Sequence, residues 1–399
     1  MVRLARSLST LIVAVIVTAG TPLSFAGQVA STLGGLGHEQ AAPPSQPMSP
    51  TEHCSSLALD NGGATVFGAN FDQVSVNAGL VFVNQRGKAK TGLSPNTTGV
   101  RARWVSKYAS VTFNLVGFGY AWAGMNERGL VLSTMSLPDT RYPAPDARPP
   151  LDTGEWVQYL LDTCATIEEV IAADTAVRIV TPDHYFVADA YGHAAAVEFL
   201  DGRMVVHTGA ELPARALANS TYDNSVRTWL DHRQAGNTNY SRLNGSLQRF
   251  CLAADRADAF RPCDDAAAIA YAFETLRRIA GERFSIHWSQ WSIVFDTANL
   301  RAYYRTLRHP DIRFVDLARF DPWCTGPVQM LDIHAGPAGD VADYFADYSH
   351  DVNLDHMRRF LLDWGIPFTE QALFWTVRHL ESYPCQRYRP PRRILARGP

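Results

Sequence analysis

The sequence predicts an α+β protein in which antiparallel sheets are covered by helices. Short β-rich segments gather in the first part of the chain, helical periodicity dominates the middle, and further β-rich segments follow. This order differs from the regular alternation of strand and helix that is typical of a parallel sheet. The chain has 399 residues, of which 46% are apolar and 11% aromatic, so it can bury a large core.

The overall charge gives no reason to expect a nucleic-acid partner. The chain carries 36 basic and 39 acidic side chains, and its formal net charge is −3. The GxGxxG and GxxxxGK[ST] motifs are absent, so nucleotide binding has no local support. HExxH and CxxC are also absent from the sequence, and its 12 histidines are scattered. We therefore expect neither a cofactor nor a metal ion.

The first 26 residues have the features of an export signal. Arg3 and Arg6 precede an uncharged run from Leu8 to Gly20, and Ser24-Phe25-Ala26 forms a small-x-small cleavage pattern. The run is shorter than the ~20 residues that a membrane-spanning helix needs. Residues 27–53 are rich in Gly, Ala, Ser, Gln and Pro, so we expect a flexible propeptide. The sequence thus predicts an exported protein without a membrane anchor.

The ordered pattern begins with a hairpin. Two β-rich runs, Cys54–Asp60 and Ala64–Phe71, are joined by Asn61-Gly62-Gly63, where positive φ angles are accessible to glycine. Val, Phe and Thr residues then indicate strands over Leu80–Val83 and Val111–Leu115, and a third strand over Gly129–Met135 after a turn at Gly124–Glu127.

The middle of the chain contains the predicted helices and a meander. Glu155–Ala173 is expected to form two helices with a break near Ala165, because Thr166 and Glu169 have the spacing of a capping box. The meander is expected over His184–Asp189, Ala194–Phe199 and Met204–His207, and further helices over Ser225–His232, Ser246–Ala254 and Ala266–Ala280.

A late hairpin and a C-terminal tail complete the predicted elements. The hairpin joins Trp291–Phe295 to Arg301–Arg305. We expect residues 54–326 to form the main domain. Residues 327–399 are expected to form a mostly helical extension packed on it, ending in a basic, Pro-rich segment.

Cys54 stands where the propeptide ends and the ordered pattern begins. A structural disulfide is the simplest interpretation of a cysteine in an exported protein, and position alone leaves it open. Cleavage of the His53–Cys54 bond, however, would give Cys54 a free α-amine beside its thiol. Their ordinary pKa values, about 7.7–8.0 and about 8.5, would let the amine take the thiol proton. Such a nucleophile needs oxyanion donors and a nearby positive charge.

Six segments support this interpretation because they occur together and in order. They are CSSLAL at Cys54–Leu59, FGANFD at Phe67–Asp72, GMNERGL at Gly124–Leu130, LANS at Leu217–Ser220, QRF at Gln248–Phe250 and WSIVFD at Trp291–Asp296. Together they resemble the choloylglycine hydrolase and penicillin V acylase family, whose members are N-terminal-nucleophile (Ntn) hydrolases of linear amides. The resemblance spans roughly residues 54–321 and implies a four-layer αββα sandwich.

The resemblance also implies roles for four residues. Cys54 would be the nucleophile, released by autocatalytic removal of the preceding segment, and Asp72 would orient its amine. Asn219 would supply an oxyanion-hole amide, and Arg249 would lie beside the nucleophile and favour the thiolate. Considered without the resemblance, Asp72 could cap a turn, Asn219 could be the N-cap of the next helix, and Arg249 could be a solvated helix residue.

Two positions depart from the family pattern. Ala69 stands where the family usually has an arginine, just before the triplet Asn70-Phe71-Asp72, and Ser136 stands where the family has Asn or Tyr. In the family these positions lie in the substrate region. We therefore expect Ala69, Asn70 and Ser136 to be near the substrate, and we do not carry over bile salts or penicillin V as substrates.

The favoured function is hydrolysis of a small-molecule N-acyl amide through a thioester on Cys54. An acyltransferase on the same scaffold and a catalytically inactive binding protein remain as alternatives. The sequence also allows a homo-oligomer.

The remaining cysteines suggest two disulfides. Cys251 and Cys263 are close enough in sequence for a short bridge, and Cys324 and Cys385 could tie the tail to the late strands. Cys164, in a helical stretch, is expected to be a buried apolar residue.

Overall fold

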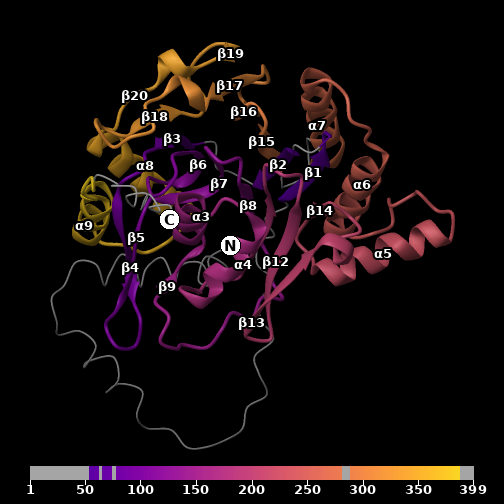
Figure 1. Cartoon of the computed structure of the whole chain (residues 1–399), viewed down its shortest axis with the longest axis horizontal. Helices are drawn as coiled ribbons and strands as arrows, with labels where there is room; N and C mark the ends of the chain where they lie inside the picture. The colour runs from indigo at the N-terminus through magenta and orange to yellow at the C-terminus, as the bar shows by residue number, and fades with distance from the viewer. Residues whose placement is uncertain (1–53, 63–64, 74–77, 281–287, 387–399) are drawn as a thin grey trace, which may run out of the picture.

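Two largely antiparallel sheets lie face to face between layers of helices and form a four-layer αββα sandwich (Figure 1). The computed structural model describes residues 54–62, 65–73, 78–280 and 288–386. The predicted export signal, the propeptide and the basic tail lie outside the described residues, as do residues 63–64 of the first predicted hairpin. The α+β class and the sandwich expected from the sequence are confirmed.

The seven-stranded sheet carries the strand that follows Cys54. In spatial order its strands are β14 (Ala216–Leu217), β1 (Ser55–Asp60), β2 (Thr65–Gln73), β15 (Trp288–Asp296), β16 (Arg301–Thr306), β17 (Arg313–Asp316) and β19 (Gly339–Asp340). The predicted pairs β1–β2 and β15–β16 are both antiparallel neighbours. Gly62, which follows β1, has a φ of 73°, a conformation that glycine adopts without strain.

The central strands of the nine-stranded sheet are buried on both faces, whereas its two edge strands are exposed or half-buried. In spatial order its strands are β13 (Arg203–Thr208), β12 (Ala194–Leu200), β11 (Asp183–Ala188), β8 (Val131–Ser136), β7 (Tyr120–Asn126), β6 (Ser110–Gly117), β3 (Leu80–Asn84), β18 (Gln329–Asp332) and β20 (Ala346–Asp347). Along β11, Phe186 and Ala188 join the core shared with the other sheet, whereas Tyr185 and Val187 join a second core. This alternation is the two-residue period of a strand between two apolar layers.

Side chains from both sheets meet in the central core. Phe67 of β2 contacts Phe186 of β11 with ring centroids 5.7 Å apart, and Phe113 of β6 lies 5.8 Å from Phe295 of β15. Such packing of aromatic rings excludes water from the space between the sheets and supplies much of the hydrophobic stabilisation.

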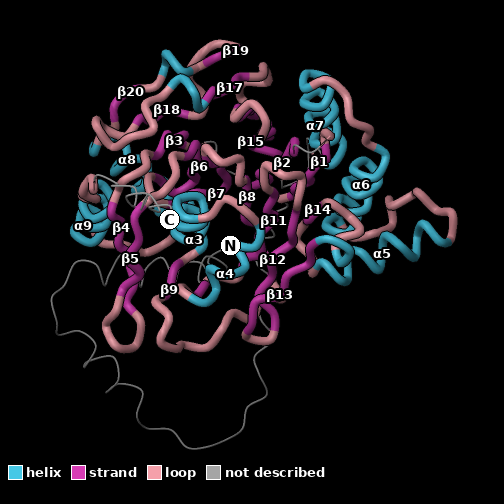
Figure 2. The backbone as a smooth tube through the Cα atoms, in the orientation of Figure 1, coloured by secondary structure: helices cyan, strands magenta, loops and turns pink. Residues whose placement is uncertain are grey.

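Helices cover the outer faces of the two sheets (Figure 2). They are α3 (Thr153–Thr163), α4 (Ile167–Ala172), α5 (Tyr222–Gln234), α6 (Gly245–Ala259), α7 (Asp265–Ile279), α8 (His350–Asp363) and α9 (Glu370–Glu381). α3 packs on β7, α6 on β1 and α7 on β2, whereas α8 contacts β6 and α9. The predicted break between α3 and α4 is confirmed, with Thr166 as the N-cap of α4. Within the described residues, no helix combines the length and apolarity required to cross a membrane.

The predicted turn at Gly124–Glu127 is wrong in its position, because β7 continues through Asn126. The Asn126 side chain ends the strand instead. Its oxygen accepts hydrogen bonds from the backbone N–H groups of Arg128 and Leu130, and its amide nitrogen donates to two carbonyl oxygens near the end of α3. The turn therefore occupies residues 127–129.

Two short two-stranded sheets and several C-terminal strands were not expected from the sequence. The small sheets pair β4 (Ala89–Pro95) with β5 (Arg101–Val105) and β9 (Pro150–Leu151) with β10 (Arg178–Ile179). After Pro327 the chain forms β18, β19 and β20 in addition to the expected helices. β18 pairs with β3, and β19 pairs with β17, so this segment contributes strands to both large sheets.

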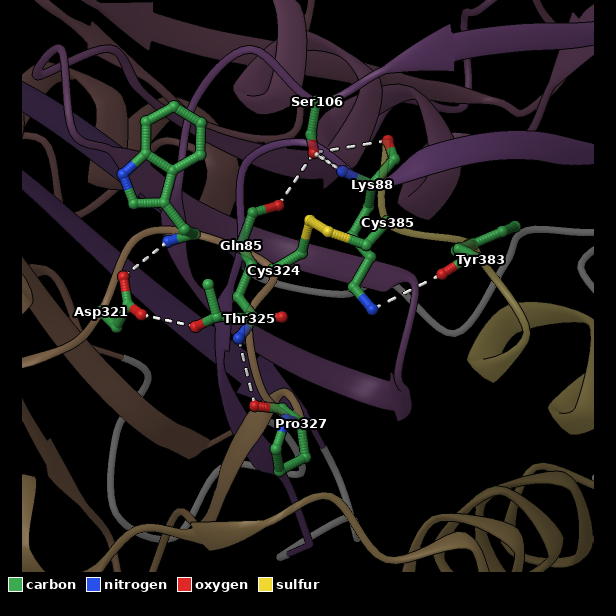
Figure 3. Close-up of a disulfide and its surroundings, with 10 residues drawn as sticks. Gln85, Lys88, Ser106, Asp321, Cys324, Thr325, Pro327, Tyr383 and Cys385 are labelled. Atoms are coloured by element: carbon green, nitrogen blue, oxygen red, sulfur yellow. Dashed lines mark hydrogen bonds between the residues drawn. A yellow bond between two sulfur atoms is a disulfide. The ribbon is translucent and has the colours of Figure 1, made fainter. Parts of the chain in front are cut away.

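One of the two suggested disulfides is present. Cys324 and Cys385 are bonded, with their Cα atoms 5.7 Å apart, and the bridge lies beside Lys88 and Ser106 (Figure 3). The suggested Cys251–Cys263 bridge is wrong, because Cys251 is buried in α6 whereas Cys263 is exposed beyond the end of that helix.

Removal of the Cys324–Cys385 bridge should destabilise the fold. We expect the double variant Cys324→Ser/Cys385→Ser to lose about 2–4 kcal/mol of unfolding free energy, because the bond closes a long loop in the unfolded chain. Urea unfolding followed by fluorescence measures this difference. Cys263→Ser, which alters an exposed free thiol, is the control and should leave the midpoint unchanged. An unchanged midpoint in the double variant would contradict the structural role of the bridge.

Candidate active site

Cys54 is held at the open end of the β1–β2 pair. Ser55 pairs with Asn70, so the residue before β1 lies at the end of β2 that contains Phe71 and Asp72. Cys54 itself has no exposed surface.

Neighbouring residues of β1 face opposite layers of the sandwich. The Ser55 hydroxyl oxygen accepts a hydrogen bond from Arg249 in the helical layer, whereas the Ser56 hydroxyl lies 2.7 Å from that of Ser133 in the other sheet. The alternation of strand side chains, carried back one residue from β1, places Cys54 on the same side as Ser56. Cys54 belongs to the large apolar cluster formed by residues of both sheets and of the helices on β1.

Arg249 connects the nucleophile candidate to the oxyanion candidate. It lies in the first part of α6 and is only 7% exposed. Its Nε donates to Ser55 Oγ at 2.9 Å, and its Nη2 lies 2.7 Å from Asn219 Oδ1 and 3.5 Å from the carbonyl oxygen of Cys54. The fork geometry of a guanidinium allows one side chain to reach all three acceptors. The interpretation of Arg249 as a solvated helix residue is therefore wrong.

The charge of Arg249 is embedded beside two candidate catalytic groups. Burial lowers the pKa of the guanidinium, while the neighbouring charges of Asp72 and Cys54 act in the opposite direction. An arginine stays protonated in proteins, so Arg249 places a positive charge at the site.

The amide of Asn219 is oriented by bonds at both of its ends. Its oxygen accepts from Arg249, which can only donate, so its nitrogen must face the other way. That nitrogen donates to the backbone carbonyl of Ser136 at 2.9 Å. An amide nitrogen carries two hydrogens, and one bond to Ser136 uses only one of them. Asn219 is not a helix N-cap, because Thr221 occupies that position in α5.

Asp72 lies within β2 and is completely buried. Its Oδ1 accepts a short hydrogen bond of 2.5 Å from the hydroxyl of Ser289, the residue with which it pairs on β15. Asp72 is thus bonded across the sheet to β15. The alternative that it caps a turn concerns residues 74–77, which lie outside the described residues.

The three expected substrate-region residues have different environments. Ala69 is completely buried in β2 between Ser56 and Ile293. The Asn70 amide donates to the carbonyl of Leu276 in α7 and accepts from Ser292 on β15, at 2.8 Å each. Ser136 ends β8 and is half-buried. Their contact with substrate stays a prediction.

Ser55 and Ser289 are two residues that sequence reasoning missed. Ser55 follows the nucleophile candidate and accepts from Arg249, and Ser289 donates to Asp72. Adjacent residues of a strand face opposite sides of the sheet, so Ser55 and Cys54 face different layers. This alternation could have indicated that Ser55 has a partner in the helical layer. The predicted late strand begins at Trp291, so Ser289 lies outside every element that the sequence predicts. Among the residues that the structure describes, no three His, Cys, Asp or Glu side chains gather as a metal site would require.

Comparison with known proteins assigns the family. Residues 54–253, half of the chain, match the linear amide C–N hydrolases of the choloylglycine hydrolase family. The chain belongs to the choloylglycine hydrolase family. Cys54, Asp72, Asn219 and Arg249 all lie within the matched residues.

Individual relatives agree with this assignment. The chain is 25% identical over 261 residues to penicillin V acylase of Pectobacterium atrosepticum, which covers 55% of this chain and 68% of that protein. The structure of penicillin V acylase from Agrobacterium tumefaciens is similar with a TM-score of 0.65 and 26% identity, covering 74% of this chain and 98% of that one. A variant of conjugated bile acid hydrolase from Clostridium perfringens shares the fold, with a TM-score of 0.58, 20% identity, and coverage of 72% and 99%.

As the chain belongs to a family of amide hydrolases, the role of Arg249 can be tested by turnover. We expect Arg249→Lys to lower kcat for amide hydrolysis about 10- to 100-fold, because one ammonium cannot reproduce the three bonds of the guanidinium. Steady-state hydrolysis measures the loss.

Arg256→Lys is a matched control on the same helix. Arg256 donates to Thr275 and lies 3.8 Å from the ring centroid of Tyr271, away from Cys54 and Asn219. Its replacement should leave kcat within about twofold of the parent, since it contacts none of the site residues. Equal effects of the two substitutions would contradict a specific role for Arg249.

Proposed function

We propose that this chain is an exported cysteine Ntn hydrolase that cleaves an N-acyl amide into a carboxylic acid and an amine. Autocatalytic cleavage of the His53–Cys54 bond would make Cys54 the N-terminal residue and the nucleophile. The single observation that supports this most strongly is the position of Arg249, whose guanidinium lies within hydrogen-bond reach of both Cys54 O and Asn219 Oδ1.

The proposed reaction uses two steps. The free α-amine of Cys54 takes the thiol proton while the sulfur attacks the acyl carbon. The carbonyl oxygen becomes an oxyanion, which accepts the second N–H of the Asn219 amide. The C–N bond then breaks, and the leaving amine takes the proton from the α-amine. Water attacks the resulting thioester, releases the carboxylic acid and restores the thiol.

Charge within the site suits this chemistry. Arg249 places a buried positive charge near Cys54, which favours the thiolate and the oxyanion over their neutral forms. Asp72 is proposed to orient the α-amine, and its bond from Ser289 restricts the orientation of the carboxylate. No residue outside Cys54 is then needed as the general base.

The substrate is proposed to be an amide with an apolar acyl group. Phe71 pairs with Trp291 next to the nucleophile, and the Phe71 ring lies 4.8 Å from that of Trp291 and 5.2 Å from that of Trp122. These rings share the central core with Cys54 and favour apolar contacts. Because Ala69 replaces the arginine that the family usually has, we do not assign penicillin V or a bile salt.

The proposed export rests on the N-terminal sequence. A basic start, an apolar run and Ser24-Phe25-Ala26 indicate signal cleavage after Ala26, and the cysteines of the Cys324–Cys385 bridge would be oxidised outside the cytosol.

Substitution of Cys54 tests the proposed nucleophile and its release together. Intact-mass analysis of the purified parent should give a chain that begins at Cys54, because the freed amine is part of the catalytic residue. Cys54→Ala should retain residues before position 54 and lose hydrolysis of an N-acyl amide panel by at least about 10³-fold, since it lacks the sulfur. An active parent that still carries residues before Cys54 would contradict the proposal.

Cys164→Ala provides the matched control for this substitution. Cys164 is also buried, and burial raises the pKa of its thiol to about 11, so it remains an unreactive thiol at neutral pH. The Cys164→Ala variant should be processed and should hydrolyse the same amides as the parent.

A further inference from the structure

Glu198 is a completely buried carboxylate that none of the proposed chemical steps uses. It lies on β12, in the nine-stranded sheet, whereas Cys54 and Arg249 belong to the other sheet and to α6. A buried charge is costly unless nearby groups compensate it, so its partners indicate what it does.

Histidines and a backbone N–H surround this carboxylate. Oε1 lies 3.1 Å from His184 Nδ1 and accepts from the backbone N–H of Tyr222 at 2.9 Å, and Oε2 lies 3.7 Å from His207 Nε2. Burial alone would raise the pKa of Glu198, but the hydrogen bonds with His184 and with the N–H of Tyr222, together with the nearby His207, lower it to about 2. The group is therefore an anion at neutral pH.

This carboxylate caps the N-terminus of α5. Thr221 is the N-cap of α5, yet its side chain makes no capping hydrogen bond. The first N–H groups of a helix have no partner within the helix, and negative charge stabilises that end. Glu198 supplies both an acceptor and a negative charge at Tyr222, the first residue of α5.

The Tyr222 side chain fixes the segment that leads into the helix. Its hydroxyl donates to the carbonyl oxygen of Ala214 at 2.8 Å and accepts from the Ala214 N–H at 3.2 Å. The ring also lies against His207, with centroids 4.7 Å apart. The two ends of the segment 214–222 are thus joined through one tyrosine. The segment contains β14, which pairs with β1, and Asn219 lies in the loop that follows β14 and leads into α5.

We propose that Glu198 is a positioning residue for Asn219. By holding the N–H of Tyr222, it would fix the loop so that the Asn219 amide meets both Arg249 and Ser136. This inference rests on the proposed function, because it assigns Glu198 an effect on the oxyanion donor rather than on the stability of the fold alone.

A double-mutant cycle tests this coupling. The four proteins are the parent, Glu198→Gln, Asn219→Ala and the combined variant, each assayed for kcat and KM with the same N-acyl amide. Glu198→Gln keeps the size of the side chain but removes its charge. We expect it to lower kcat about tenfold with KM within twofold, and to change kcat less than twofold when Asn219 is already Ala, because contacting networks are not additive.

Two further variants separate positioning from general destabilisation. Tyr222→Phe removes the hydroxyl bonds to Ala214, and its kcat effect should likewise disappear in the Asn219→Ala background; it also serves if Glu198→Gln does not fold. Asp162→Asn is the control, because Asp162 is a buried carboxylate bonded to Trp104, Gln158 and Lys90, outside the site. It should lower the melting temperature without lowering kcat.

Each outcome bears on one of the two claims. If the kcat effects of Glu198→Gln and Asn219→Ala multiply independently in an active parent, the positioning role is overturned while the proposed hydrolase stands. A correctly processed parent that hydrolyses none of the amides overturns the proposed function, and the positioning role falls with it.

Discussion

The arrangement of the site depends on the hydrogen bonds made by one buried group, the guanidinium of Arg249. Because an unpaired buried cation is costly, its acceptors on Ser55, Cys54 and Asn219 restrict where α6 can lie relative to β1 and to the loop before α5. The same bonds bring together residues that are far apart in the sequence. The hydrogen bonds that hold α6 against β1 are therefore the same ones that orient the site residues.

This constraint also explains how two opposite requirements are met. The central core around Cys54 is apolar and excludes water, which strengthens electrostatic interactions, yet the proposed chemistry needs a stable positive charge. Arg249 approaches from the helical layer, where Ser55 and Asn219 supply acceptors, so the polar network lies on one side of β1 and the aromatic side chains on the other.

Sequence reasoning predicted the parts of the fold whose signals are local. The hairpin glycines predicted the turn between β1 and β2, and the spacing of Thr166 and Glu169 predicted where α4 begins. The motifs, taken in order, indicated the family. It misplaced the turn at Asn126 because that side chain bonds to α3, a contact distant in sequence. For the same reason it missed Ser289, because the register that pairs β2 with β15 cannot be read from residue types. It also missed the role of Ser136, because a backbone carbonyl acceptor does not depend on which residue carries it.

The most direct test of the central claim is to trap the acyl-enzyme. Mature protein mixed with a slowly hydrolysed N-acyl amide would be quenched in acid within the first turnover, digested and analysed by mass spectrometry. The account predicts that the acyl mass is carried by the peptide that begins at Cys54 and is released by hydroxylamine, as a thioester should be. Turnover with the acyl group on another residue, or with none bound at any time, would contradict it.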